Sequence, residues 1–294
     1  MKYAAEEGAR VINLSYGREG FPSWYEQDMI DFLTETYHVV FVASGGNTFT
    51  DGPYFPASYN NVLAVGHSNS GDQRTGSTTH NYFLDVLAPG AGVASIQNGG
   101  GYNNSITGSS YAAPFVAGIA ALLIEKFPSL TGQQIAELIR TTADDVYGIS
   151  PNNSHPFKLG KGRVNARRAL TEKDTRPAIR MSDYTFSSSV GRQILFGGET
   201  LTLHCDFTNY LAPSSSNLQV SLSLSEDSPN CDVTVPNVLC TDEVNITTGT
   251  ATLGVMNTLE TLTRDFTVDI NTSEYWKRVQ FKLTITDTGT GYSD

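Results

Sequence analysis

Cysteine, histidine and basic residues are all scarce in this 294-residue chain. It has three Cys and five His, and its 19 Lys and Arg stand against 30 Asp and Glu, a formal charge of −11. Nucleic acids and anionic membranes bind basic faces, so this acidic balance argues against both as partners. No apolar run is long enough to span a bilayer, and residues 1–7 do not form a signal peptide.

The cysteines and histidines also do not cluster. Cys231 and Cys240 are close enough in sequence to pair across a short loop, which leaves Cys205 as a small buried residue on a strand. The histidines occur singly, at His38, His67, His80, His155 and His204. Because metal ligands recur at short fixed spacings, we expect no metal site.

The first 170 residues alternate between two kinds of hydrophobic pattern. Apolar runs expected as strands occur at residues 11–15, 39–43, 62–66 and 84–88. Helices are expected after Pro22, from about Ser110, and from about residue 133 to 142, where Thr131 and Gln134 fit a capping box. Strands alternating with helices predict an α/β fold with a parallel sheet flanked by helices, in a domain of residues 1–172.

Beyond a polar linker at residues 171–177, apolar residues recur at every second position. Apolar and polar residues alternate at residues 201–207, 218–224, 266–270 and 279–285. Half-buried strands have this period, and turns rich in Gly, Asn, Ser and Pro separate them. Residues 178–294 are therefore predicted to form an all-β antiparallel sandwich of roughly seven strands.

One stretch, Thr107 to Gly118, places a serine where a loop becomes a helix. Small residues surround Ser110, and apolar positions at helical spacing follow it. In the first turn of a helix, unpaired N–H groups and the helix dipole favour a developing anion, as an acyl-transfer nucleophile requires. On these residues alone, a cap or turn serine is the alternative.

The sequence Gly108-Ser109-Ser110-Tyr111-Ala112-Ala113-Pro114, with Val116-Ala117-Gly118 after it, resembles the nucleophile motif of subtilisin-like serine peptidases, the subtilases. That motif reads Gly-Thr-Ser-Met-Ala-Ser-Pro-His-Val-Ala-Gly. The departures at Ser109, Tyr111, Ala113 and Phe115 leave the serine itself in place. The resemblance implies that Ser110 is the nucleophile of a serine endopeptidase acting on a polypeptide substrate.

Further landmarks extend the resemblance over roughly residues 1 to 170. They are residues 11–17, 39–47, 55–57, 87–90 and 160–165. The resemblance implies that Asn47 donates a side-chain hydrogen bond to the oxyanion, whereas the residue alone would fit a turn after two glycines. It also implies a partial subtilisin-like fold.

The same resemblance implies a pocket for the side chain that precedes the scissile bond. Its walls would be Ser15-Tyr16-Gly17 and Ser44-Gly45-Gly46. Tyr54 falls where many relatives keep a glycine at the pocket floor, so its phenol would restrict the pocket to small side chains; a surface-loop tyrosine is the alternative. The Phe55-Pro56 bond is a candidate for the cis form.

The catalytic Asp and His motifs of subtilases, which resemble Asp-Thr/Ser-Gly and His-Gly-Thr, do not occur in this chain. Three explanations follow. The one we favour is that the chain is the C-terminal part of a normal peptidase whose Asp/His segment is elsewhere. The second is an inactive subtilase-like pseudoenzyme that serves as a binding or adhesion module. The third is another hydrolase, in which Ser110, Asp144 or Asp145, and His155 follow the α/β-hydrolase order.

On the favoured explanation these 294 residues by themselves are nearly inert, because nothing takes the proton of Ser110. The missing peptidase segment becomes an expected partner, and the first domain should expose an apolar sheet edge. By the family resemblance we expect an extracellular or cell-surface location and allow calcium as a ligand, with no other cofactor. The second domain resembles the fibronectin-III-like or CARDB-like sandwiches appended to secreted bacterial peptidases.

Overall fold

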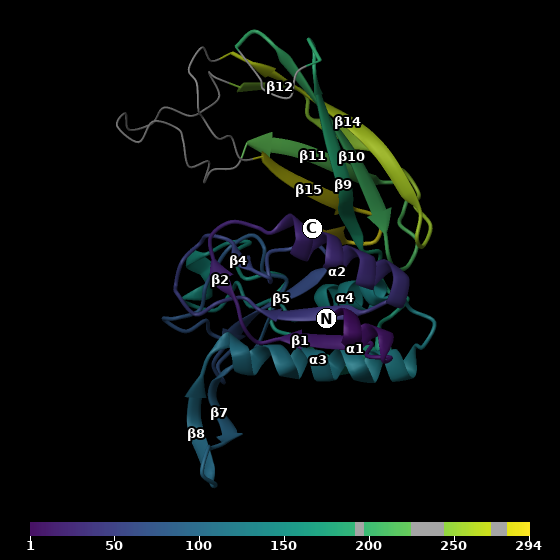
Figure 1. Ribbon diagram of the computed structural model, residues 1–294. Coiled ribbons are helices and arrows are strands. Elements are labelled where there is room, and N and C mark those ends of the chain that lie inside the picture. The colour runs from purple at the N-terminus through teal and green to yellow at the C-terminus, as the bar shows by residue number, and fades with distance from the viewer. Residues whose placement is uncertain (192–196, 225–243, 272–280) are drawn as a thin grey trace, which may run out of the picture. The chain divides into compact units, whose positions relative to one another are not determined.

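The structure is a computed structural model that describes residues 1–191, 197–224, 244–271 and 281–294. The chain divides into two compact units, Met1–Lys173 and Asp174–Asp294 (Figure 1). The expected pairing of Cys231 with Cys240 lies outside the described residues. In the described residues no helix is long and apolar enough to cross a bilayer.

A four-stranded parallel sheet forms the centre of the first unit. Its strands are β1 (Val11–Leu14), β3 (Val40–Ser44), β5 (Val62–Ser68) and β6 (Val86–Pro89), in the order β1-β3-β5-β6. Every residue of β3 and β5 is buried, which explains why both strands are nearly continuous apolar runs. The predicted parallel sheet is confirmed, and β1 forms one of its edges.

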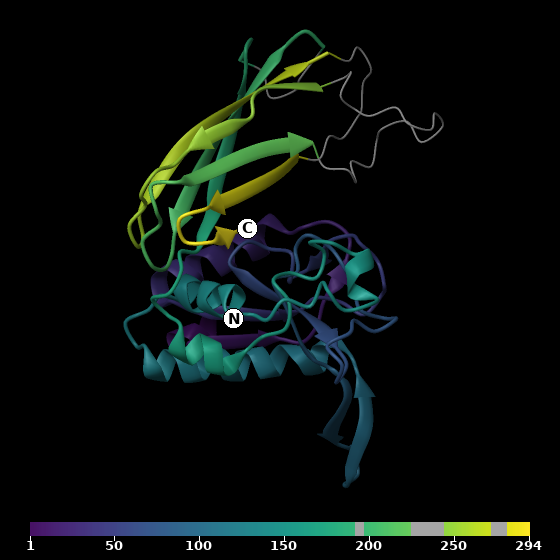
Figure 2. The ribbon, with the colours of Figure 1, turned by 180° about the vertical axis from the view of Figure 1, so that it is seen from behind.

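Helices lie on both faces of this sheet (Figures 1 and 2). The long helix α3 (Ser109–Lys126) runs along one face, and α2 (Trp24–Tyr37) and α4 (Gly132–Thr141) lie on the other. The predicted capping box of α4 is present, since Thr131 and Gln134 bond each other's backbone N–H groups. Shorter helices complete the unit: α1 (Lys2–Glu6), a 3₁₀ turn (Asn152–Ser154) and α5 (Ala166–Thr171).

Two small antiparallel pairs lie outside the sheet. Strand β2 (Arg18–Glu19) pairs with β4 (Tyr54–Phe55), and the peptide bond that follows β4, Phe55-Pro56, is cis as predicted. The hairpin of β7 (Ala91–Ile96) and β8 (Tyr102–Thr107) projects from the unit and was not predicted (Figure 2). Its second strand leads directly into α3.

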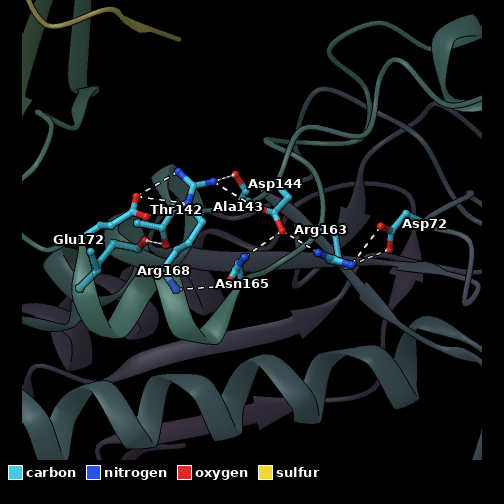
Figure 3. A network of polar contacts seen from close by, with 9 residues as sticks. Asp72, Thr142, Ala143, Asp144, Arg163, Asn165, Arg168 and Glu172 are labelled. Carbon is cyan, nitrogen blue, oxygen red and sulfur yellow. Dashed lines mark hydrogen bonds and ion pairs between the residues drawn. The ribbon is translucent and has the colours of Figure 1, made fainter.

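A chain of charged groups fastens the last part of the first unit to the loop that follows β5 (Figure 3). Arg163 bonds Asp72 at 3.0 Å and Asp144 at 2.6 Å, and Arg168 bonds the other oxygen of Asp144 at 3.1 Å. Desolvation opposes ionisation of Asp144, but hydrogen bonds from Arg163, Asn165 and Arg168 outweigh it and lower the pKa of this carboxyl. The network joins the end of α4 to α5 and to the loop that carries Asp72.

In its described residues the second unit contains two four-stranded antiparallel sheets. One has the order β12-β14-β10-β9 and the other β13-β11-β15-β16. Their bounds are β9 Ile179–Ser188, β10 Thr200–Asn209, β11 Leu218–Leu224, β12 Val244–Thr248, β13 Thr250–Thr252, β14 Thr261–Ile270, β15 Phe281–Asp287 and β16 Tyr292–Ser293. Alternate residues of both sheets, among them Phe207, Phe266 and Val220, form one core that also buries Cys205.

Candidate active site

Helix α3 begins at a glycine in an unusual backbone conformation. Gly108 has a φ of 156°, a backbone conformation that side chains rarely adopt, and its N–H donates to the carbonyl of Gly90 at 2.7 Å. A Cβ added there would lie 3.5 Å from Oδ1 of Asn47. The chain therefore enters α3 close beside the Asn47 side chain, with Ser110 in the first turn.

Asn47 caps this helix from a distant part of the sequence. It follows β3, and its Oδ1 accepts the backbone N–H of Ser109 at 2.7 Å and the Ser109 hydroxyl at 3.0 Å. A backbone N–H can only donate, so the amide oxygen must face it and Nδ2 must face away. Within the described residues Nδ2 meets no acceptor, and the exposed Asn47 side chain keeps a free donor.

Ser109 holds the Asn47 loop against the start of the helix. Its fully buried hydroxyl lies 2.6 Å from the hydroxyl of Ser44, and it accepts the N–H of Gly46 at 3.2 Å. These bonds tie the end of β3 to the first residue of α3. In the sequence, Ser109 is recognisable only as a departure from the family motif. Its position next to Ser110 is the feature that could have indicated its role in positioning the Asn47 loop.

Ser110 itself faces the end of β1. Its Oγ donates to the backbone carbonyl of Ser15 at 3.2 Å, and the Ser15 hydroxyl donates to the carbonyl of Ser110 at 3.0 Å. Ser110 is half-buried, and its backbone N–H belongs to the first turn, where a helix supplies no acceptor. In the described parts of the chain no imidazole or carboxylate hydrogen-bonds to the Ser110 hydroxyl.

Tyr54 lies between the two segments named as pocket walls. A Cβ on Gly17 would come within 2.2 Å of Tyr54 Cε1, and a Cβ on Gly46 within 3.1 Å of Tyr54 Cδ2. Its ring therefore contacts both glycines. Gly45 faces Leu84 instead, since a Cβ added to Gly45 would lie 2.3 Å from Leu84 Cδ2. The side chain of Tyr16 is exposed.

The histidines of the first unit serve other contacts. His67 is buried, its Nε2 lies 2.7 Å from the hydroxyl of Thr75, and burial lowers its pKa to about 4. His38 ends α2 in a left-handed conformation. His80 and His155 pack against each other with ring centroids 3.9 Å apart.

The α/β-hydrolase alternative is wrong. It needs Asp144 or Asp145 to orient His155, but the carboxylate of Asp144 is held by Arg163, Asn165 and Arg168. Asp145 accepts the backbone N–H of Tyr147 at 2.8 Å. Since His155 lies against His80, these side chains form no catalytic triad.

Comparison with known proteins explains this arrangement of serine and amide. The family model for the subtilase family of peptidases matches residues 1–165. The chain belongs to the subtilase family. Alkaline elastase YaB from Bacillus sp. (strain YaB) is 34% identical over 169 residues, which are 58% of this chain and 42% of that protein. Thermitase from Thermoactinomyces vulgaris is 35% identical over 168 residues, 57% of this chain and 56% of thermitase.

Solved structures of proteases also match more than half of the chain. A protease from Pseudoalteromonas arctica PAMC 21717 has 28% identity and a TM-score of 0.50, covering 56% of this chain and 51% of its own. The patellamide maturation protease PatA has 26% identity and a TM-score of 0.53, covering 58% of this chain and 65% of its own. The chain thus spans about half the length of these relatives.

Proposed function

We propose that this chain carries the nucleophile and oxyanion donors of a serine endopeptidase. The observation that supports the proposal is the Asn47 amide, fixed by Ser109 beside the first turn of α3 with its Nδ2 donor free. Ser110 Oγ would attack the scissile carbonyl carbon, and the oxyanion would accept bonds from Asn47 Nδ2 and the Ser110 N–H. The amine then leaves with a proton, and water hydrolyses the acyl-enzyme at Ser110.

The base would come from a subtilase segment that carries Asp and His. The hydroxyl of Ser110 donates to the Ser15 carbonyl, which is too weak a base to take its proton, so the chain by itself would be nearly inert. Two exposed features of the first unit support a docking site for such a segment. The open edge of β1 ends beside Ser15, and α3 has an apolar face on which Phe115 is 49% and Leu122 51% exposed.

An active-site probe tests this proposal. A fluorophosphonate should label Ser110 readily in a version of the chain extended by the Asp- and His-bearing segment of a subtilase, and only very slowly in the 294-residue chain. The Ser110→Ala variant of the extended chain is the matched control, and its labelling should disappear. Equal labelling with and without the segment would contradict the missing-base argument, and no labelling in either would favour the pseudoenzyme.

The position of Tyr54 further implies a substrate class. Its ring lies between Gly17 and Gly46, so the pocket would accept small side chains before the scissile bond. In the extended enzyme, Tyr54→Ala should raise the ratio of kcat/KM for Phe over Ala at that substrate position by about 10- to 100-fold. Tyr25→Ala, which removes an exposed tyrosine of α2, is the matched control. An unchanged ratio in the Tyr54 variant would show that the ring lies outside the pocket.

The remaining assignments follow from the family. We propose an extracellular or cell-surface location, and for the second unit a β-sandwich of the fibronectin-III-like or CARDB-like kind that acts in spacing, adhesion or stabilisation. The proposal keeps calcium as a ligand that the family resemblance allows and includes no other cofactor.

A further inference from the structure

Three aromatic rings meet where the loop that carries Asn47 and Phe49 packs against two other loops. Phe49 lies 5.0 Å from His80 and 6.3 Å from His155, and the two imidazoles are 3.9 Å apart, all measured between ring centroids. Phe49 has a φ of 54°, which is uncommon for a bulky residue. We call these three residues the histidine clasp.

Hydrogen bonds join the clasp to the Asn47 loop. The His80 N–H donates to the Thr50 carbonyl at 3.0 Å, and the Thr48 N–H donates to the Thr79 hydroxyl at 3.2 Å. The side chain of Asn81 donates to the Gly52 carbonyl at 2.7 Å. Residues 48–52 therefore rest on residues 79–81, and a change in the packing of His80 changes the support of the segment that follows Asn47.

The clasp is built for neutral imidazoles. His80 is 8% exposed, and its Nδ1 is buried with no hydrogen-bond partner. The charged groups around it are mostly cationic: the guanidinium of Arg74 lies 5.0 Å from the Phe49 ring, and Lys158 approaches both the Tyr82 ring and the carboxylate of Asp51. The anion that acts on the two histidines is Asp51, whose side chain is 69% exposed, and the carboxylate of Glu19 accepts the Thr50 hydroxyl of the same loop at 3.0 Å.

We propose that the histidine clasp is an acid-sensitive device: it holds residues 48–52 while His80 and His155 are neutral and releases them when the imidazoles are protonated. Two imidazolium rings 3.9 Å apart would repel each other and would also be repelled by Arg74 and Lys158. The same cations make the pair a poor metal site. The proposal does not depend on peptidase activity, because it concerns the folding of one loop.

Burial lowers the pKa of His155 to about 4, helped by His80, Arg74 and Lys158, and burial also lowers the pKa of His80. In the open loop both pKa values would return to the ordinary value near 6.5. Opening is then independent of pH above that value and becomes more favourable as pH falls below it, until the pKa of the closed state is reached. At pH 5.5 His155, whose pKa in the closed loop is about 4, contributes about a tenfold increase in the open population, and His80 acts in the same direction.

Hydrogen exchange of the 294-residue chain tests the clasp. Protection factors of backbone amides in residues 45–54 and of His80 should fall by about tenfold or more between pH 7.5 and pH 5.5. In His80→Phe/His155→Phe, which keeps three aromatic rings in contact but has no titratable ring in the clasp, the protection factors should be the same at both pH values. His67→Gln is the matched control, and it should keep the full decrease.

A second measurement does not depend on whether the double variant folds. Exchange of the imidazole C2 hydrogens in the wild-type chain gives the pKa of each histidine, and the pKa of His80 should lie below 6.5 and that of His155 near 4. The proposal is overturned if these two histidines titrate near 6.5, if protection of residues 45–54 is independent of pH in the wild type, or if the double variant shows the same decrease as the wild type.

Discussion

Replacing Ser110 by alanine is expected to lower kcat for peptide hydrolysis by about 10⁶ in the chain completed with its Asp and His segment. The size of the effect is that known for removal of the nucleophile in subtilisin itself. It is so large because the acyl-enzyme cannot form without this oxygen, and the oxyanion donors and binding contacts that remain provide only a small residual rate. The measurement is the hydrolysis of a chromogenic peptide by variant and parent at equal concentration.

The fold should tolerate this change. The Ser110 hydroxyl makes one hydrogen bond, to the Ser15 carbonyl, and the residue is only half-buried, so Ser110→Ala should retain the parent's circular dichroism. Ser105→Ala, an exposed position on β8, is the matched control and should keep the parent's kcat. If Ser110→Ala retained most of the activity, the nucleophile would lie elsewhere and the proposed mechanism would be wrong.

Much of the first unit could be predicted because its signals are local. The apolar runs that form β3 and β5 are long and buried on both faces, and Thr131 and Gln134 lie three residues apart, so both patterns are visible in a short window. The proximity of Asn47 to Ser110 could not be derived from such a window. It came from the family resemblance, and the structure brings the two together through the bonds of Asn47 to Ser109.

The β7–β8 hairpin and the histidine clasp were missed for physical reasons. The hairpin is mostly polar or exposed along both strands, and Gly99, Gly100 and Gly101 occupy its turn, so it has no apolar alternation to detect. The clasp joins Phe49, His80 and His155, three single residues from separate loops. Contacts of that kind leave no periodic pattern in a sequence.

The hydrophobic pattern of helix α3 predicts only part of how the helix packs. Its sequence is apolar on nearly all sides, which is typical of a helix buried inside a larger fold. In this chain Val116, Ala120 and Leu123 are buried against the sheet, whereas Phe115 and Leu122 remain exposed. The pattern thus predicted the face that packs against the sheet but not the second apolar face, which is exposed at Phe115 and Leu122.

The second large effect is expected at Asn47. Asn47→Asp and Asn47→Ala should each lower kcat by about 10²–10³ in the completed enzyme with little change in KM, a size taken from the corresponding amide donor of subtilisin. Both variants remove the Nδ2 donor, which acts only on the charge that develops in the transition state. In Asn47→Asp a negative charge also faces the oxyanion, so its kcat should fall at least as far as that of Asn47→Ala.

The two variants separate this donor from the capping role that the structure shows. Asp keeps an oxygen for the Ser109 N–H, which Asn47 accepts at 2.7 Å, whereas Ala removes it and should destabilise the fold by about 1 kcal/mol. Urea denaturation measures this difference and peptide hydrolysis measures kcat. Equal losses of kcat with unequal losses of stability would support an amide that both caps α3 and stabilises the oxyanion. If Asn47→Asp retained the parent's kcat, Asn47 would be a helix cap alone, and the oxyanion would depend on the N–H of Ser110.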